Sequence, residues 1–179
     1  SGHICGLLGK NGEGKTTLLN LLSGQIFPDQ GSCLVLEETP SERNARFLQQ
    51  IFLLPEEISM PEVTAIEYIK MYAPFYPTFR DDICKACVES FEINLSDRLS
   101  KMSQGQRKKV AITLALAAHT PLLLMDEPTN GLDIPSKATF RRLVASLIDD
   151  NQTVIISTHQ VRDLESLIDT VSVSYTHLT

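Results

Sequence analysis

Short apolar runs alternate along this chain with longer segments in which apolar residues recur every three or four positions. Brief apolar runs that end at glycine, proline or polar residues are typical of strands buried in a parallel sheet. We expect such strands at residues 3–8, 33–36, 51–54, 122–125 and 154–157. Strands that alternate with helices predict an α/β domain with a mainly parallel sheet.

Helical spacing marks the segments between these runs. Residues 16–23 carry paired leucines and end at Gly24, a residue type that commonly closes a helix. Further helices are expected at residues 106–118, at 136–148 and, after the last strand, at a segment carrying Val161, Leu164 and Ile168.

The composition changes between residues 61 and 105. Aromatic side chains gather on helical spacing there, and Pro74 and Pro77 interrupt the pattern. We expect residues 61–105 to form a helical subdomain inserted between strands of the sheet.

The overall composition is that of an ordinary globular domain. The chain has 179 residues, 42% of them hydrophobic, and a formal net charge of −6. That length fits one domain, and the longest apolar stretch, at 110–118, is shorter than the roughly 18 to 20 residues of a membrane span. The acidic balance argues against a general nucleic-acid binder.

Four cysteines, including the spaced pair Cys84 and Cys87, are too few for a disulfide scaffold, so we expect packed thiols in a reducing compartment.

A glycine-rich segment follows the first expected strand. Residues 9–16 match the pattern G-x-x-x-x-G-K-[ST], between a strand and a helix as its mechanism requires. Glycines let the backbone wrap a phosphate group, and the amides of the helix N-terminus attract its charge. Lys15 would reach the β- and γ-phosphates, and the Thr16 hydroxyl would bind Mg²⁺. The alternative is a glycine-rich turn without a ligand, which the flanking elements disfavour.

Two adjacent acids, Asp126 and Glu127, end the most apolar run. Ligands of open α/β sheets bind at the carboxyl ends of the strands. Asp126 would therefore hold Mg²⁺ through water, and Glu127 would polarise the attacking water, provided that the chain turns at Pro128. The alternative, two solvated acids at the end of a strand, weakens beside a phosphate loop because a magnesium nucleotide needs this second ligand.

Two further polar residues stand at element boundaries. Ser103 precedes the helix at 106–118 and is expected either to cap it or to contact an anion there. His159 follows the last strand, where it could reach a γ-phosphate. A lone histidine is more often structural or exposed, but its place after a core strand favours a functional role.

Taken together, these segments resemble the ATP-binding cassette (ABC) ATPases. GKNGEGKTT looks like the Walker A motif, MSQGQ like the LSGGQ signature, LLLMDEP like Walker B, NGLD like the D-loop and STHQ like the H-switch. The motifs occur in family order across residues 2–173. The resemblance implies a P-loop NTPase core with an inserted α-helical subdomain that carries the signature.

The resemblance also implies a set of site residues. Glu127 and His159 would be catalytic. Thr16, Asp126 and Glu56 would lie at Mg²⁺. The nucleotide contacts would be Gly9, Asn11, Gly12, Gly14, Lys15, Thr16, Thr17, Ser103, Gly105, Gln106 and Asp133. Of these, the signature residues would contact the nucleotide held by a partner subunit.

The mechanism that the family implies is a head-to-tail dimer of two ABC subunits, identical or different, that sandwiches two ATP molecules with Mg²⁺. Hydrolysis would drive a membrane-spanning permease from the cytoplasmic face of the cell membrane, without nucleic acid. The short cassette is similar to bacterial ABC-2-type exporters, and the aromatic residues at 68–79 lie where such cassettes receive coupling helices, although about half of them are expected in the subdomain core. The alternatives are a non-transport ATPase acting on ribosomes or nucleic acid, and a regulatory subunit that only binds nucleotide. The latter would usually lack Glu127 or His159.

The sequence departs from the family pattern at several points. Gln104 replaces the middle signature glycine. Glu56 stands where many members carry the Q-loop glutamine, and a carboxylate can approach Mg²⁺ but cannot donate a hydrogen bond. Glu13 is expected to turn toward solvent or a partner subunit, because a carboxylate is unfavourable beside phosphates. We expect the N-terminal strands of the family and its adenine-stacking aromatic residue to be absent from this sequence. Residues 174–179 have no counterpart, so we expect one ABC ATPase domain over 1–173, truncated at both ends, and a foreign tail.

Overall fold

The central element is a parallel sheet of four strands. A computed structural model describes residues 3–10, 12–160 and 167 of the chain. The strands are β1 (His3–Leu8), β2 (Ile51–Leu54), β3 (Leu122–Asp126) and β4 (Thr153–Thr158). They lie in the order β1-β4-β3-β2, and each neighbouring pair is parallel. The predicted α/β architecture is therefore confirmed.

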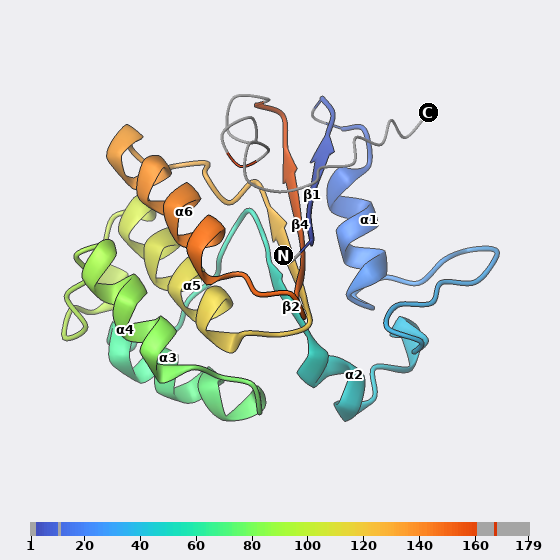
Figure 1. Cartoon of the computed structure of the whole chain (residues 1–179), viewed down its shortest axis with the longest axis horizontal. Helices are drawn as coiled ribbons and strands as arrows, with labels where there is room; N and C mark the ends of the chain where they lie inside the picture. The colour runs from blue at the N-terminus through green and yellow to red at the C-terminus, as the bar shows by residue number, and fades with distance from the viewer. Residues whose placement is uncertain (1–2, 11, 161–166, 168–179) are drawn as a thin grey trace.

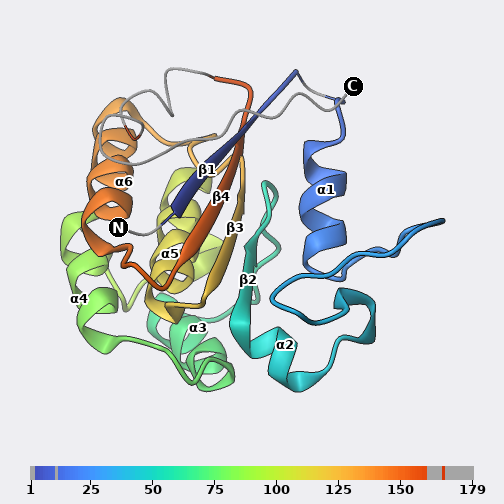
Figure 2. The same ribbon diagram turned by 45° about the vertical axis from the view of Figure 1, so that its right-hand side comes forward.

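Helices cover both faces of this sheet (Figures 1 and 2). The α-helices are α1 (Lys15–Leu22), α2 (Ala45–Gln50), α3 (Ala65–Tyr72), α4 (Asp81–Ser90), α5 (Gln104–Ala118) and α6 (Ile134–Leu147). Short 3₁₀ turns occur at η1 (Pro40–Glu42), η2 (Ala73–Phe75) and η3 (Leu99–Lys101). In Figure 2, α1 stands on one side of the sheet, where Phe47 of α2 packs with its Leu19, while α5 and α6 lie on the other side. The sheet is thus the middle layer of three.

Strand β3 shows how the sheet separates two cores. Because successive side chains of a strand point to opposite faces, Leu122 and Leu124 pack with Leu19 in the smaller cluster on the α1 side. Leu123 and Met125 join the larger cluster on the side of α5 and α6. Every residue of β3 is buried, as its uniformly apolar sequence predicts.

Helix α5 is the most deeply buried helix described. All of its side chains from Val110 to Ala118 are buried between the sheet and α4. Its start is fixed by a capping box, in which Ser103 Oγ accepts from Gln106 N and Gln106 Oε1 accepts from Ser103 N. The predicted N-cap at Ser103 is confirmed.

The segment between β2 and α5 is helical, as the aromatic-rich composition predicts. Thr64 and Glu67 form a second capping box at the start of α3. The aromatic side chains divide between two environments. Tyr68 is buried, which raises its pKa to about 12, whereas Tyr72 and Phe75 are exposed. About half of these rings therefore do belong to the core.

One predicted strand is wrong. Residues 33–36 form a single bridge between Val35 and Glu38, not a strand. Among the described residues no neighbouring strand offers hydrogen-bonding partners there, and Leu34 is 70% exposed. An apolar run becomes a strand only where another strand lies beside it. The helix predicted around Val161 and the tail at 174–179 lie outside the described residues.

A parallel sheet brings every strand's carboxyl end to the same edge. β1 leads into the glycine-rich loop, β2 into Glu56, β3 into Glu127 and β4 into His159. Segments that are far apart in the sequence thus meet at one place in the fold. Within the described residues, no helix is long and apolar enough to cross a membrane.

Candidate nucleotide site

A cavity of about 400 Å³ opens at this edge of the sheet. Its lining consists of Gly12, Gly14, Lys15, Thr16, Thr17, Glu56, Asp126 and Glu127. These residues follow three different strands, and all were expected at the site from the sequence. The fold therefore brings together the glycine-rich loop, the acid pair and Glu56.

The glycine-rich loop takes a conformation that favours glycine. Gly12 and Gly14 have φ values of 87° and 85°, in the left-handed region. Lys15 is buried, and its Nζ donates to the carbonyl oxygens of Gly9 at 2.7 Å and of Lys10 at 2.9 Å. The ammonium group is thus held across the mouth of the loop, where a phosphate would replace carbonyl oxygens. Asn11 lies outside the described residues.

Glu13 folds back onto its own loop. Its Oε2 accepts a hydrogen bond from Lys10 N at 2.8 Å, and the residue is exposed. A Cβ added at Gly9 would lie only 2.5 Å from the same oxygen. Gly9 therefore leaves room for a carboxylate that lies along the loop, at the exposed rim of the cavity.

Asp126 is joined to both neighbouring elements. Its Oδ2 accepts from the Thr16 hydroxyl at 2.6 Å, and its Oδ1 accepts from the Ser157 hydroxyl. Asp126 is 3% exposed. A carboxylate and a hydroxyl in contact at the edge of a phosphate-sized cavity supply the oxygen ligands that Mg²⁺ prefers. Thr16 and Asp126 therefore fit such an ion, although the described residues contain no group of three or more acidic, histidine or cysteine side chains that could enclose a metal.

Glu127 lies at the turn that the sequence analysis required. Its φ is 44°, in the left-handed region, so its side chain leaves the alternation of β3 and lines the cavity. Glu127 Oε1 lies 2.8 Å from His159 Nδ1. The other oxygen, Oε2, is buried and has no hydrogen-bond partner among the described residues. A buried carboxylate oxygen without a partner is costly, and strain at such a position is typical of functional sites.

Ser157 lies at the site, although no role was predicted for it from the sequence. Its hydroxyl donates to Asp126 and accepts from Glu127 N at 3.2 Å, while its carbonyl oxygen accepts from the same amide at 3.1 Å. One buried residue of β4 thus orients both acids. The available signal was its position, after the apolar residues 154–156 and two residues before His159.

The signature residues do not line this cavity. Ser103 and Gln106 are exposed at the start of α5 and bond to each other. Gly105 lies against the loop after β3, since a Cβ there would approach Gly131 O to 2.9 Å. Asp133 caps α6 by accepting from Ser136 N at 2.8 Å, and hydrogen bonds from Ser136 lower its pKa. In the described chain, these four predicted contacts therefore form a separate surface.

Glu56 is held at two points. Its Oε1 accepts from Asn130 Nδ2 at 2.9 Å, and its main-chain oxygen accepts from Lys108 Nζ at 2.6 Å. The carboxylate lines the cavity, but its Oε1 is hydrogen-bonded to the loop after β3. Glu56 is therefore not a free metal ligand.

Comparison with known proteins identifies the family. The model of the family described as "ABC transporter" matches residues 1–130. This chain belongs to the ABC transporter family. It is 33% identical over 178 residues to the ABC transporter ATP-binding protein NatA of Bacillus subtilis, covering 95% of this chain and 72% of NatA. It is also 32% identical over 175 residues to the SkfA peptide export ATP-binding protein SkfE of the same organism, covering 94% and 71% respectively.

Solved structures share the fold of this cassette. The dimeric structure of a post-hydrolysis state of the ATP-binding cassette MJ0796, bound to ADP and phosphate, superposes with a TM-score of 0.79 at 22% identity. It covers 97% of this chain and 80% of that one. The solved structure confirms the predicted P-loop NTPase fold. The family model and the relatives show that the chain is an ATP-binding subunit of an ABC transporter and an ATPase.

Proposed function

We propose that this cassette powers an exporter of the ABC-2 type. The observation that carries the assignment of its chemistry is the meeting at one cavity of Lys15, from the glycine-rich loop, with the acid pair Asp126 and Glu127 at the end of β3. The export direction is supported by the similarity to SkfE, a peptide export ATP-binding protein. We take residues 1–173 as one ABC ATPase domain, in which residues 61–105 form the helical subdomain.

Binding begins at the glycine-rich loop. The loop amides and the start of α1 would surround the β-phosphate, with Gly9, Gly12, Gly14 and Thr17 allowing close approach and Asn11 beside them. Lys15 would exchange its bonds to two carbonyl oxygens for bonds to the β- and γ-phosphates, which carry more negative charge. Thr16 and Asp126 would hold Mg²⁺, with Glu56 nearby. Bound there, the ion would neutralise charge on the β- and γ-phosphate oxygens.

Hydrolysis would use the Glu127–His159 pair. Glu127 Oε2, which has no described protein partner, would accept a proton from a water molecule as the water oxygen bonds to the γ-phosphorus. The bond between that phosphorus and the β–γ bridging oxygen breaks, and ADP leaves. His159 would hold Glu127 through the contact between His159 Nδ1 and Glu127 Oε1. The other side of its imidazole ring would contact the γ-phosphate.

The separate surface formed by Ser103, Gly105, Gln106 and Asp133 would complete the site of a second ABC subunit. The start of α5 is capped, and both residues of its capping box, Ser103 and Gln106, are exposed. Such a start attracts the γ-phosphate of a nucleotide held by the partner. Two cassettes would thus sandwich two ATP molecules head to tail, as the dimeric MJ0796 structure of the same fold supports.

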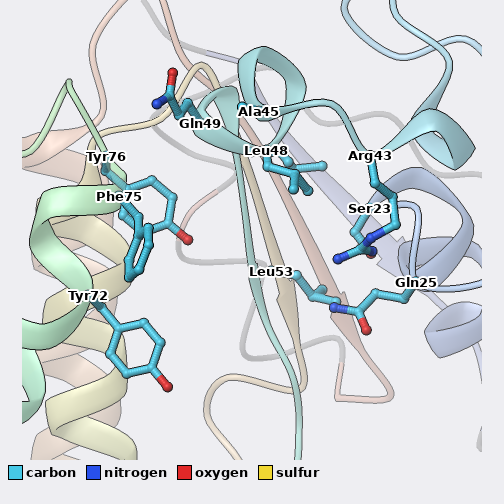
Figure 3. Close-up of a pocket in the computed structure, with 11 residues that line it drawn as sticks. Ser23, Gln25, Arg43, Ala45, Leu48, Gln49, Leu53, Tyr72, Phe75 and Tyr76 are labelled. Atoms are coloured by element: carbon cyan, nitrogen blue, oxygen red, sulfur yellow. The ribbon is translucent and has the colours of Figure 1, made fainter.

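The membrane-spanning permease would dock at a groove beside the helical subdomain, on the cytoplasmic face of the cell membrane. A cavity of about 420 Å³ lies between α2, β2 and η2. Figure 3 shows Tyr72, Phe75 and Tyr76 on one side and Arg43 and Gln25 on the other. Phe75 is 65% exposed, and an exposed aromatic ring beside polar residues is typical of a protein interface.

The site assignment is tested by Lys15→Ala. Losing the ammonium group should raise the Kd for ATP about thirtyfold or more, because charge-assisted hydrogen bonds contribute roughly 2 kcal/mol. Equilibrium titration with a fluorescent ATP analogue measures this, with Lys10→Ala as the control from the same loop. Unchanged affinity in Lys15→Ala would remove the phosphate-loop assignment.

The dimer is tested by mixing two inactive variants. Lys15→Ala chains keep a functional signature, and Ser103→Arg chains keep a functional phosphate loop. A heterodimer of the two contains one intact composite site, so partial hydrolysis should return on mixing. No recovery in a verified heterodimer would contradict the head-to-tail arrangement.

A further inference from the structure

A buried lysine on α5, the helix that begins at the signature residues and is called the signature helix below, holds Glu56 but does not line the nucleotide cavity. Lys108 lies in the second turn of α5 and is 2% exposed. Removing an ammonium group from water costs several kcal/mol unless nearby groups compensate. Burial accordingly lowers the pKa of Lys108, and the carboxylates of the nucleotide cavity oppose that shift. The acidic groups of the cavity therefore favour the charged form of this buried lysine.

The hydrogen bond that Lys108 makes is to the main chain of Glu56. Its Nζ donates to Glu56 O at 2.6 Å, across 52 positions of sequence. The Glu56 side chain is bound from another direction, by Asn130 Nδ2 at 2.9 Å. Helix α5, through Lys108, and the loop after β3, through Asn130, thus both hold Glu56.

Glu56 also separates two cavities. It lines the nucleotide cavity and a smaller one of about 180 Å³. The smaller cavity is lined as well by Lys108, Arg107 and Gln104 from the first turns of α5. Lys108 therefore stands between the start of the signature helix and the wall of the nucleotide cavity in the same chain.

We propose that Lys108 is a positioning residue for ATP hydrolysis, which ties the signature helix to Glu56 at the nucleotide cavity of its own chain. Because Lys108 and Ser103 belong to one helix start, a shift of that start when a partner's nucleotide binds would carry Lys108 and the Glu56 main chain with it. The direction of this coupling, from the partner's nucleotide through α5 to Glu56, rests on the proposed head-to-tail dimer. The contact itself lies within one chain.

The test replaces Lys108 by methionine, which has a similar length and no charge. Turnover should fall about tenfold or more, whereas the Kd for ATP should stay within about threefold because Lys15 and its loop are unchanged. The methionine side chain fills a similar volume and removes the desolvation cost of a buried ammonium group, and the hydrogen bond that is lost is to the main chain of an exposed residue, Glu56. The melting temperature should therefore stay within a few degrees of wild type. Lys108→Arg, which keeps a donor and a charge, should recover part of the turnover.

Two controls separate the possible outcomes. Lys85→Met removes an exposed lysine on α4 and should change none of the readouts. Glu127→Gln, measured in parallel, reports on the proposed site itself. If Glu127→Gln loses turnover and Lys108→Met does not, the inference about Lys108 is overturned. If both keep full turnover, the proposed catalytic site is what fails, and the positioning role fails with it.

A fluorescence measurement follows the Glu56 segment without reference to turnover. The chain contains no tryptophan, so Glu57→Trp places a single indole beside the smaller cavity. Its emission should shift when Mg·ATP is added, and Lys108→Met should change the emission of the free protein and reduce that shift at least twofold. Identical emission and response with and without the Lys108 substitution would overturn the proposal. A loss of melting temperature that accounts for the lost turnover would also overturn it, because Lys108 would then be only structural.

Discussion

The two ends of the central sheet belong to the same four strands, yet their polar groups are arranged differently. At the amino ends, polar side chains close neighbouring loops. Gln152 Nε2 donates to Thr120 O at 3.0 Å, and His119 Nε2 lies 3.0 Å from Asp149 Oδ2. These contacts join the two loops that enter β3 and β4, and they face no cavity of the nucleotide site.

At the carboxyl ends, the contacts join different motifs around a cavity. The Thr16 hydroxyl reaches Asp126 across 110 positions of sequence. Glu127 adopts a positive φ and lies 2.8 Å from His159. These pairs surround a cavity, which the paired groups at the amino ends do not.

Each end leaves one buried polar atom without a described partner: His119 Nδ1 at the amino ends and Glu127 Oε2 at the carboxyl ends. Burying a carboxylate oxygen costs more than burying a neutral ring nitrogen, since the charge is lost from water. The position of a polar residue at a strand end therefore does not indicate a functional site until its partners are known. Three substitutions sharpen this contrast.

The largest effect is expected for Glu127→Gln at the carboxyl ends. The amide keeps the shape of the side chain but cannot take the proton of water, so turnover should fall about a hundredfold or more. ATP binding should persist, and the ATP-bound dimer should accumulate. Turnover and dimer content are measured by phosphate release and size-exclusion chromatography. Glu89→Gln, an exposed acid on α4, is the matched control, and an unaltered rate in Glu127→Gln would remove it as the catalyst.

An intermediate effect is expected for Ser157→Ala. Asp126 and the Glu127 amide both lose a buried partner, which should lower the free energy of unfolding by about 1–3 kcal/mol. Misplaced acids should also reduce turnover about tenfold. Urea unfolding and phosphate release measure the two effects. Ser146→Ala, whose hydroxyl only donates to Leu143 O within α6, should leave turnover unchanged; equal losses in both variants would contradict the role given to Ser157.

The smallest effect is expected for Asp149→Asn at the amino ends. A hydrogen bond from Asn151 N, with His119 nearby, lowers the pKa of Asp149. A lowered pKa stabilises the folded state above the unfolded pKa of about 4, and this stabilisation disappears as the pH falls through the folded pKa. Wild type should therefore melt about 1–2 °C above the variant at pH 6, and this difference should shrink as the pH falls below the unfolded pKa. Turnover at pH 7 should not change. A difference in melting temperature that grows toward low pH would contradict the assignment.

Much of the fold followed from local pattern. The strand at 51–54 was predicted with the bounds that the structure has, because a short apolar run between polar segments has few other ways to bury its side chains. The helix expected at 106–118 begins two residues earlier, since its capping box includes Ser103. The run at 33–36 has equally apolar residues but lacks a neighbouring strand among the described residues, and no local signal reports that.

The sequence by itself determined the chemistry of the site: a phosphate loop at 9–16, an acid pair at Asp126 and Glu127, and the order of motifs that marks the family. These depend on residue type and local spacing, which the chain carries without folding. Only the tertiary structure decided how the groups are paired. Ser157 orients both acids, Lys108 reaches Glu56, and the signature residues lie apart from the cavity of their own chain. The physical reason is that hydrogen bonds and burial depend on distance in space, and the parallel sheet makes neighbours of residues that the sequence keeps far apart.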